Sequence, residues 1–228
     1  MQKITIKELV EFRRKSDKSK MNFAFKLKTR TEKNKVDTEN EGGGDYWVTS
    51  TSSIYNTFKH DKDEFYDDKI EELHLRYSTT EDLRVKDMYR RNIEILENFK
   101  DFDFKDLRPR DISKFETVHK DSKILILNNF PIYLNPSLIF CFERNGKDEI
   151  GALWLVPQLE GFQKSELGMF CEILHRFLIK NYSANYQISE DYCIAVDTFN
   201  AQTVIYSDLV NGQIPFLIDK TLEEVKNI

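Results

Sequence analysis

Cysteine pairs, metal-binding motifs and long apolar runs are all missing from this chain of 228 residues. The three cysteines, Cys141, Cys171 and Cys193, are odd in number and widely spaced, which argues against a disulfide framework and predicts buried thiols. The four histidines are scattered, and no HxxxH or CxxC motif occurs, so no metal site is expected from them. The first residues are charged and amphipathic where an export signal would be apolar, which predicts a cytoplasmic protein.

The longest stretch without a charged residue covers positions 124–142 and has 19 residues. That length is nominally sufficient to span a bilayer. The stretch is interrupted by turn-forming and polar residues: Asn128, Asn129, Pro131, Asn135, Pro136 and Ser137. We therefore interpret it as paired strands and expect no membrane partner.

The remaining composition describes one domain of ordinary content with an uneven charge distribution. Apolar residues make up 40% of the chain and charged residues 32%, which is enough to bury a core. The net charge of −5 divides into +8 over residues 1–35, with 12 Lys/Arg and 4 Asp/Glu, and −13 over the remainder. Lysine outnumbers arginine 23 to 11, as in proteins of AT-rich bacterial or phage genomes. We expect a basic helical segment with a flexible Gly-rich loop over 1–45 and a single α/β domain over 46–228, helical at 46–108.

The basic segment begins with a capping box, Thr5 with Glu8, followed by a short amphipathic helix. Further along, cations alternate with aromatic side chains, a pattern typical of nucleic-acid surfaces because cations neutralise phosphates and rings stack on bases. The predicted nucleic-acid-binding residues are Arg13, Arg14, Lys15, Lys18, Lys20, Lys26 and Lys28. The alternative is an amphipathic helix whose cations are simply solvated.

Apolar periodicity predicts the elements of the acidic domain. Helices are expected around 54–58, capped by Ser52 or Ser53, and at 63–77, 80–99, 165–182 and 222–228. Strands are expected at 124–127, 132–143, 149–156, 192–196 and 203–206. Asn145-Gly146 predicts a tight turn between two of these strands, and the apolar run 153–156 indicates a strand buried on both faces.

The order helix, three strands, helix, strand over about 81–206 resembles the αβββαβ core of the PD-(D/E)XK nuclease superfamily. The resemblance implies an α+β (α/β) fold with a central mixed sheet and a restriction-endonuclease-like core. In that superfamily, an acidic residue on the first helix, an Asp at the second strand and a Glu/Gln-x-Lys on the third hold magnesium and position water. Glu94 and Glu97 are available on the helix, but Ser137 replaces the Asp, and Ala152 and Trp154 replace the Glu and Lys. The resemblance therefore implies a nuclease-like fold without hydrolysis.

Three functions remain open at this point. The first is a catalytically inactive, nuclease-like domain that binds nucleic acid as a subunit of a larger complex. The second is a protein-interaction or scaffold module that does not bind nucleic acid. The third is a magnesium-dependent nuclease with a migrated site built from Glu94, Glu97 and Asp197, although Asp197 also fits a strand-terminating turn. Only the third needs a cofactor, magnesium, and a protein partner is expected for the first two.

Overall fold

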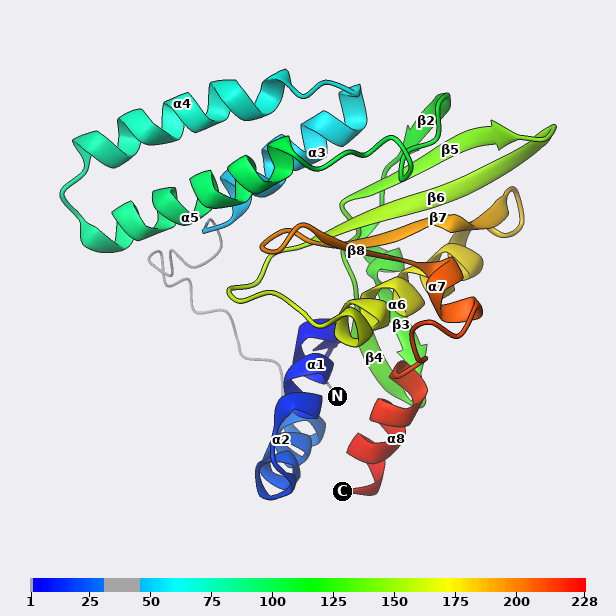
Figure 1. Ribbon diagram of the computed structural model, residues 1–228. Coiled ribbons are helices and arrows are strands. Elements are labelled where there is room, and N and C mark those ends of the chain that lie inside the picture. Colours follow the sequence, from blue (N-terminus) through cyan, green and yellow to red (C-terminus); the bar gives the residue numbers. More distant parts are fainter. Residues whose placement is uncertain (1, 31–45) are drawn as a thin grey trace.

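The computed structural model describes residues 2–30 and 46–228, which form two β-sheets and the helices that cover them (Figure 1). The larger sheet has the strand order β2 (Ile112–Glu116), β5 (Leu138–Arg144), β6 (Lys147–Val156), β7 (Gln187–Asp197) and β8 (Gln202–Ile205). Strands β6 and β7 are parallel and all the other neighbours are antiparallel. The smaller sheet has the order β1 (Ile4–Thr5), β4 (Phe130–Tyr133) and β3 (Ile124–Leu127). The protein is thus an α+β protein with mixed sheets.

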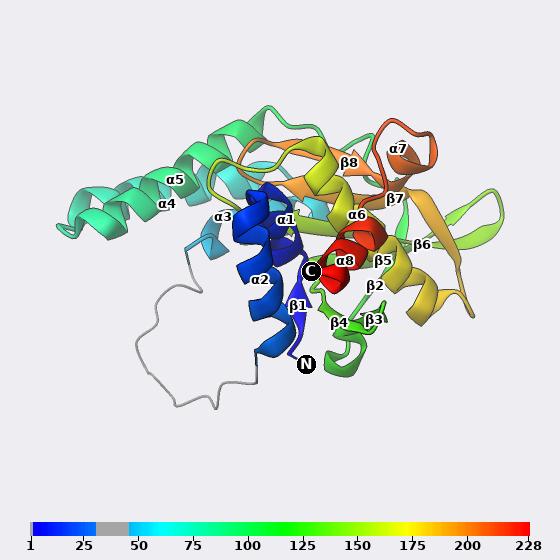
Figure 2. The same ribbon diagram turned by 90° about the horizontal axis from the view of Figure 1, so that it is seen from below.

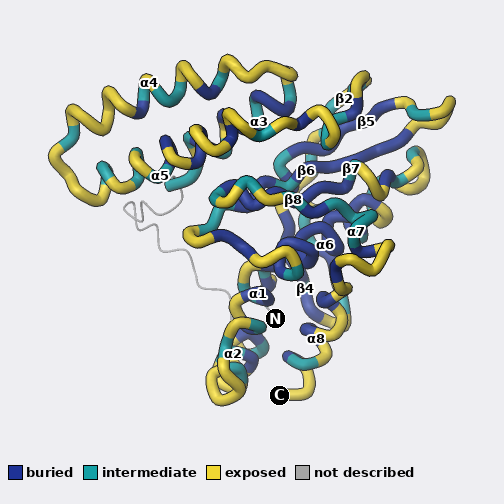
Figure 3. The backbone as a smooth tube through the Cα atoms, in the orientation of Figure 1, coloured by how far each residue is buried: buried dark blue, intermediate teal, exposed yellow. Residues whose placement is uncertain are grey.

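The connection between the parallel strands is α6 (Lys164–Tyr182), which lies at the centre of the molecule. Its residues are buried almost continuously from Glu166 to Leu178, so the helix has no wide solvent face (Figure 3). A helix that is buried all round needs apolar side chains all round. This explains why the sequence pattern located it so well, and the helix predicted for 165–182 is confirmed.

The opposite face of the large sheet is covered by α3 (Val48–His60), α4 (Glu64–Thr79) and α5 (Leu83–Lys100). These helices and the sheet share one apolar cluster, to which Ile54, Phe58, Leu96, Phe99, Phe140, Leu153 and Ile194 belong. Asp82 caps α5 by accepting from the backbone N–H groups of Arg84 and Val85. Figure 1 shows that the α4–α5 hairpin projects beyond the sheet.

The N-terminal residues are packed into the opposite side of the molecule. The predicted capping box is confirmed: Thr5 and Glu8 bond each other at the start of α1 (Ile6–Arg14), and α2 (Asp17–Thr29) follows. Strand β1 pairs in parallel with β4, and both helices lie beside that small sheet and α8 (Ile218–Asn227) (Figure 2). Ile4, Leu9, Phe12 and Leu27 belong to the same core as α6. The described part of the basic segment therefore shares a core with the acidic domain, while the Gly-rich loop lies outside the described residues.

The strand arrangement differs from the sequence prediction at β1, which was not predicted, and in two further places. The predicted strand 132–143 is divided into β4 and β5, because Pro136 lacks the N–H that a continuous ladder requires. The predicted strand 124–127 forms, but it belongs to the small sheet, and β2 takes its place beside β5. By contrast, the turn at Asn145-Gly146 is confirmed, with φ values of 56° and 74° that suit a type I′ hairpin.

The helix boundaries differ in smaller ways. Helix α3 begins at Val48, so the predicted cap Ser53 lies inside the helix and donates to the carbonyl of Thr49. Two short helical segments were not predicted, η1 (Lys120–Lys123) and α7 (Tyr206–Val210). Both are too short to show an apolar period in the sequence.

Candidate functional site

The carboxyl ends of β6 and β7 lie side by side, with Val156 opposite Asp197 in the parallel register. Ligands of open α/β sheets commonly bind beyond this end of parallel strands. The loop 157–163 follows β6 there and leads into the first turn of α6. A ligand-binding site is therefore expected at this end of the sheet.

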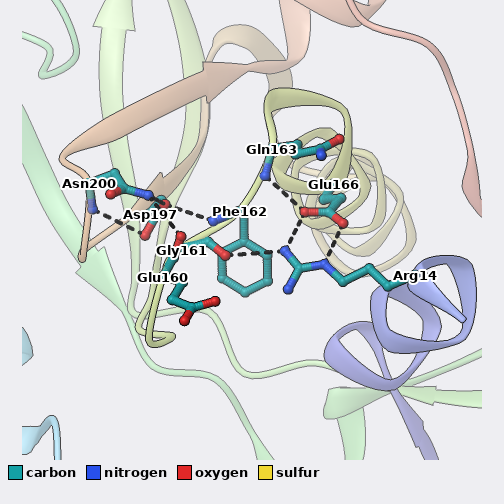
Figure 4. A network of polar contacts seen from close by, with 8 residues as sticks. All are labelled: Arg14, Glu160, Gly161, Phe162, Gln163, Glu166, Asp197 and Asn200. Atoms are coloured by element: carbon teal, nitrogen blue, oxygen red, sulfur yellow. Dashed lines mark hydrogen bonds and ion pairs between the residues drawn. The ribbon is translucent and has the colours of Figure 1, made fainter.

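Asp197 is fully buried there, and its carboxylate is saturated by hydrogen bonds from its own chain (Figure 4). Oδ2 accepts from the backbone N–H of Phe162 at 2.9 Å and from Nδ2 of Asn200 at 3.0 Å. Oδ1 accepts from the backbone N–H of Phe199 at 2.9 Å. These bonds join the turn after β7 to the loop before α6. Asp197 thus forms a strand-terminating turn, which the sequence offered as the alternative to a catalytic role.

Arg14 on α1 closes the same end of the sheet through Glu166 on α6 (Figure 4). Nε donates to Oε1 at 2.6 Å, and the guanidinium also donates to the carbonyl of Gly161 at 3.2 Å. Glu166 in turn accepts from the backbone N–H of Gln163 at 2.8 Å and so caps α6. Burial acts to raise the pKa of Glu166, but the hydrogen bonds from Arg14 and Gln163 outweigh it and leave the pKa lowered. The positive end of the α6 dipole is therefore already compensated by the carboxylate of Glu166.

Glu94 and Glu97 lie on α5, whereas Asp197 is the last residue of β7. Alternation along β7 places Asp197 on the face packed by α6, whereas α5 packs against the opposite face. Glu94 accepts from Arg90 at 2.7 Å and lines a cleft of about 370 Å³ with Phe199 and Asn200, and Glu97 is exposed. The three candidate catalytic residues do not come together. Across residues 2–30 and 46–228, no group of three or more His, Cys, Asp or Glu side chains has the geometry to hold a metal ion.

Two of the residues at the positions of the resemblance do come together. Ser137 accepts from the backbone N–H of Leu155 at 3.0 Å, and the Trp154 ring packs edge-to-face on Phe170 with 5.3 Å between centroids. Ala152, two residues before Trp154 on β6 and paired with Ile139, is fully buried. Ser137 and Trp154 line one cavity of about 340 Å³, to which α1 adds Lys7.

Lys7 was missed by the sequence reasoning, although a signal existed. It lies in the first turn of α1, where the helix dipole favours acidic rather than basic side chains. A residue that breaks such a local preference often serves a site.

Most of the predicted nucleic-acid-binding cations are engaged within the chain. Besides Arg14, Lys15 pairs with Glu11 at 2.8 Å, Lys20 pairs with Glu224 at 2.6 Å, and Arg13 donates to Thr221 at 3.2 Å. Lys18, Lys26 and Lys28 form no ion pair with any residue of the described ranges. The structure thus separates the seven predicted residues into four that contact other residues of the chain and three, all on α2, that have no ion-pair partner in the described ranges.

The predicted buried thiols are confirmed for all three cysteines. Burial raises the pKa of the Cys141 and Cys193 thiols, so both are held in the unreactive protonated form. The Cys171 thiol donates to the carbonyl of Cys193 at 2.9 Å. These side chains belong to the core, not to a site.

Comparison with protein-family models, with curated proteins and with solved structures gave no match. The resemblance to the nuclease superfamily stays a prediction. None of the helices in the described ranges combines the length and the apolar character needed to cross a bilayer.

Proposed function

We propose that this protein is a non-catalytic, cytoplasmic binding module, built on a nuclease-like core, that docks an acidic and partly apolar segment of a partner protein on the outer side of α2. Within the large sheet and its helices, the order α5, β2, β5, β6, α6, β7 supports the nuclease-like core, although β3 and β4 of the small sheet are inserted between β2 and β5. The separation of Glu94 and Glu97 from Asp197 supports the absence of catalysis. The proposed docking site rests on the surface of α2.

The observation behind it is a pair of exposed apolar side chains on a helix whose other face is buried. Met21 is 58% exposed and Phe25 is 66% exposed, and they lie one turn apart on α2. Lys18, Lys26 and Lys28 border them, and Ile228 from the end of α8 is 43% exposed beside Met21, across a cleft of about 400 Å³. We call Lys18, Met21, Phe25, Lys26, Lys28 and Ile228 the α2 surface. Asp17 and the Lys20–Glu224 pair also line that cleft. Large apolar side chains beside three unpaired lysines of the described ranges match a segment that has apolar residues and negative charge.

A protein partner fits this surface better than a nucleic acid. Lys18, Lys26 and Lys28 can make three phosphate contacts, which correspond to a slope of about −3 when log K is plotted against log salt concentration. Ordinary DNA-binding proteins make about six to ten phosphate contacts. The four other predicted cations already have partners in the chain. Arg14, Lys15 and Lys20 pair with Glu166, Glu11 and Glu224, and Arg13 donates to Thr221. Residues 36–228, with 22 Lys/Arg and 35 Asp/Glu, would also repel a polyanion. Met21 and Ile228 have no ring to stack on a base.

Site-specific photo-cross-linking in the producing cells tests the proposal. A photo-reactive phenylalanine analogue is placed at position 25, and at position 75 as the matched control, because Leu75 on the projecting hairpin is also 66% exposed. We expect position 25 to label a protein segment with net negative charge and apolar residues, and Lys18→Gln with Lys26→Gln to abolish that labelling. Labelling of nucleic acid at position 25 would support the nucleic-acid hypothesis instead. The same set of labelled proteins at both positions would refute the α2 surface as a docking site.

A further inference from the structure

The cavity beside Lys7 has the size and position of a small-molecule site. Its volume of about 340 Å³ falls in the range of ligand pockets, and it opens at the carboxyl end of β6. Five separate parts of the chain build it: the start of α1, residue 51 of α3, the segment from β4 to β5, the end of β6 and α6. Three of its lining residues are aromatic: Tyr133, Trp154 and Phe170.

Lys7 is the only charged residue that lines this cavity, and it lacks a carboxylate partner in the described part of the chain. Its ammonium group donates to the carbonyl oxygen of Pro157 at 2.5 Å, which leaves two of its three N–H bonds to be satisfied. Although the side chain reaches solvent, the cavity walls displace water from the ammonium, and this burial lowers the pKa of Lys7. A bound anion would supply the partner that the protein does not.

The neutral polar groups of the cavity add further donors. The Ser137 oxygen accepts from the Leu155 N–H, so its own proton remains available. The indole N–H of Trp154 and the hydroxyl of Tyr133 form no hydrogen bond within residues 2–30 and 46–228. A second cation, Lys3, lies outside the cavity with its ammonium 4.2 Å from the centre of the Tyr133 ring. The cavity lining therefore holds several hydrogen-bond donors and one positive charge, and it holds no carboxylate.

We infer that this cavity binds a small organic anion in which a carboxylate or phosphate group is joined to a flat ring through a linker such as a methylene or a ribose. The anionic group pairs with Lys7, and the ring lies among Tyr133, Trp154 and Phe170. None of the residues that line the cavity belongs to the α2 surface, so this inference does not rest on the proposed docking. The ligand chemistry has two common sources, aromatic carboxylates and nucleoside monophosphates.

Tryptophan fluorescence gives a direct test, since the chain has only two tryptophans. In a Trp47→Phe background the signal comes from Trp154 alone. The probes are two matched pairs, phenylacetate with phenylacetamide, and AMP with adenosine, so that each anion is compared with a neutral molecule of similar shape. We expect at least one anion to quench Trp154 and to bind at least tenfold more tightly than its neutral counterpart. The pair that shows the larger difference identifies the source.

Three variants establish whether Lys7 is responsible. Lys7→Met keeps the aliphatic stem and is expected to remove the tenfold preference without weakening the neutral probe. Lys7→Arg, which retains the charge, is expected to keep most of the preference and shows that any loss is not a failure to fold. Lys18→Met on α2 is the matched surface control and should leave the preference unchanged. Equal affinity for anion and neutral probe, no response to any of the four probes, or a preference that survives Lys7→Met would each overturn the inference.

Discussion

Arg14 and Glu166, 152 positions apart in the chain, face each other as a two-pronged ion pair at the end of the β-sheet (Figure 4). The Arg14 side chain is 40% exposed, whereas that of Glu166 is only 8% exposed. A carboxylate in that position depends on its cation, because removal of the partner leaves a buried charge without compensation. The pair therefore joins the N-terminal helices to the central helix α6.

Loss of this cation is expected to destabilise the fold. Arg14→Met should lower the free energy of unfolding by about 2 kcal/mol, as measured by urea denaturation at neutral pH. The control is Lys15→Met, whose partner Glu11 is 55% exposed, and which should cost less than about 0.5 kcal/mol. Arg14 helps to lower the pKa of Glu166 below its ordinary 4.5. The stability that the ion pair contributes should therefore be complete above pH 4.5 and should be lost as the pH falls through the lowered pKa of Glu166. Equal losses for the two variants would contradict this assignment.

Gly161 and Gly146 form a matched pair for testing how closely the loop before α6 is packed. Both have positive φ, +70° and +74°. A Cβ at position 161 would lie 1.9 Å from Nδ2 of Asn200 and 2.2 Å from Oδ2 of Asp197, whereas one at position 146 would meet nothing within 4 Å. Gly146→Ala is expected to cost about 1 kcal/mol for the backbone conformation alone. Gly161→Ala should cost at least about 2 kcal/mol more, since it also disrupts the Asp197 bonds. Similar midpoints in thermal or urea unfolding would show that the loop relaxes.

His175 on α6 is expected to make stability depend on pH between about 4 and 6.5. Its ring stacks on Tyr206 with 3.6 Å between centroids, and burial, assisted by the neighbouring Arg176, lowers its pKa from 6.5 to about 4. Because the unfolded state binds the proton more readily, stability is complete above pH 6.5 and declines as the pH falls toward 4, by at most about 3 kcal/mol. His175→Phe should flatten this part of the stability curve. His119→Gln, at an exposed position, should not.

Magnesium is expected to leave DNA and RNA intact in the presence of this protein. Glu94, Glu97 and Asp197 form no metal-binding group in the described part of the chain, and Asp197 already accepts from Phe162, Phe199 and Asn200. The assay is incubation of single- and double-stranded DNA and RNA with purified protein, with and without magnesium. Cleavage that requires magnesium and disappears in Glu94→Gln would revive the migrated nuclease site.

The features that sequence analysis located are those encoded within a few residues of one another. The Thr5–Glu8 capping box and the Asn145-Gly146 turn depend on local backbone geometry, and α6 depends on continuous apolar content. Strand β2 was missed because Ile112–Glu116 is a half-exposed edge strand with little apolar alternation. The cap of α3 was misplaced because serines often cap helices, whereas α3 begins at Val48 after Trp47 and contains both Ser52 and Ser53.

The site was less predictable than the fold because it depends on contacts between distant segments. An apolar face on a short basic helix indicates that this face is buried. It does not indicate whether the face is buried in the same chain or against another molecule. The Arg14–Glu166 pair and the meeting of Lys7 with Trp154 both join residues about 150 positions apart. Such pairs leave no pattern in the neighbouring sequence. Cations that pair with distant residues of the chain were therefore predicted to bind nucleic acid.

The parallel pairing of β1 with β4 has a consequence for synthesis of the chain. Ile4 pairs with Ile132, so the first strand has no partner until some 128 further residues have left the ribosome. At about 5–20 residues per second, this delay is on the order of 6–25 s. During that time α1 and α2 have neither their sheet nor α6 to cover their apolar sides. The nascent basic helices are thus free to meet chaperones or anionic surfaces that the finished protein no longer engages.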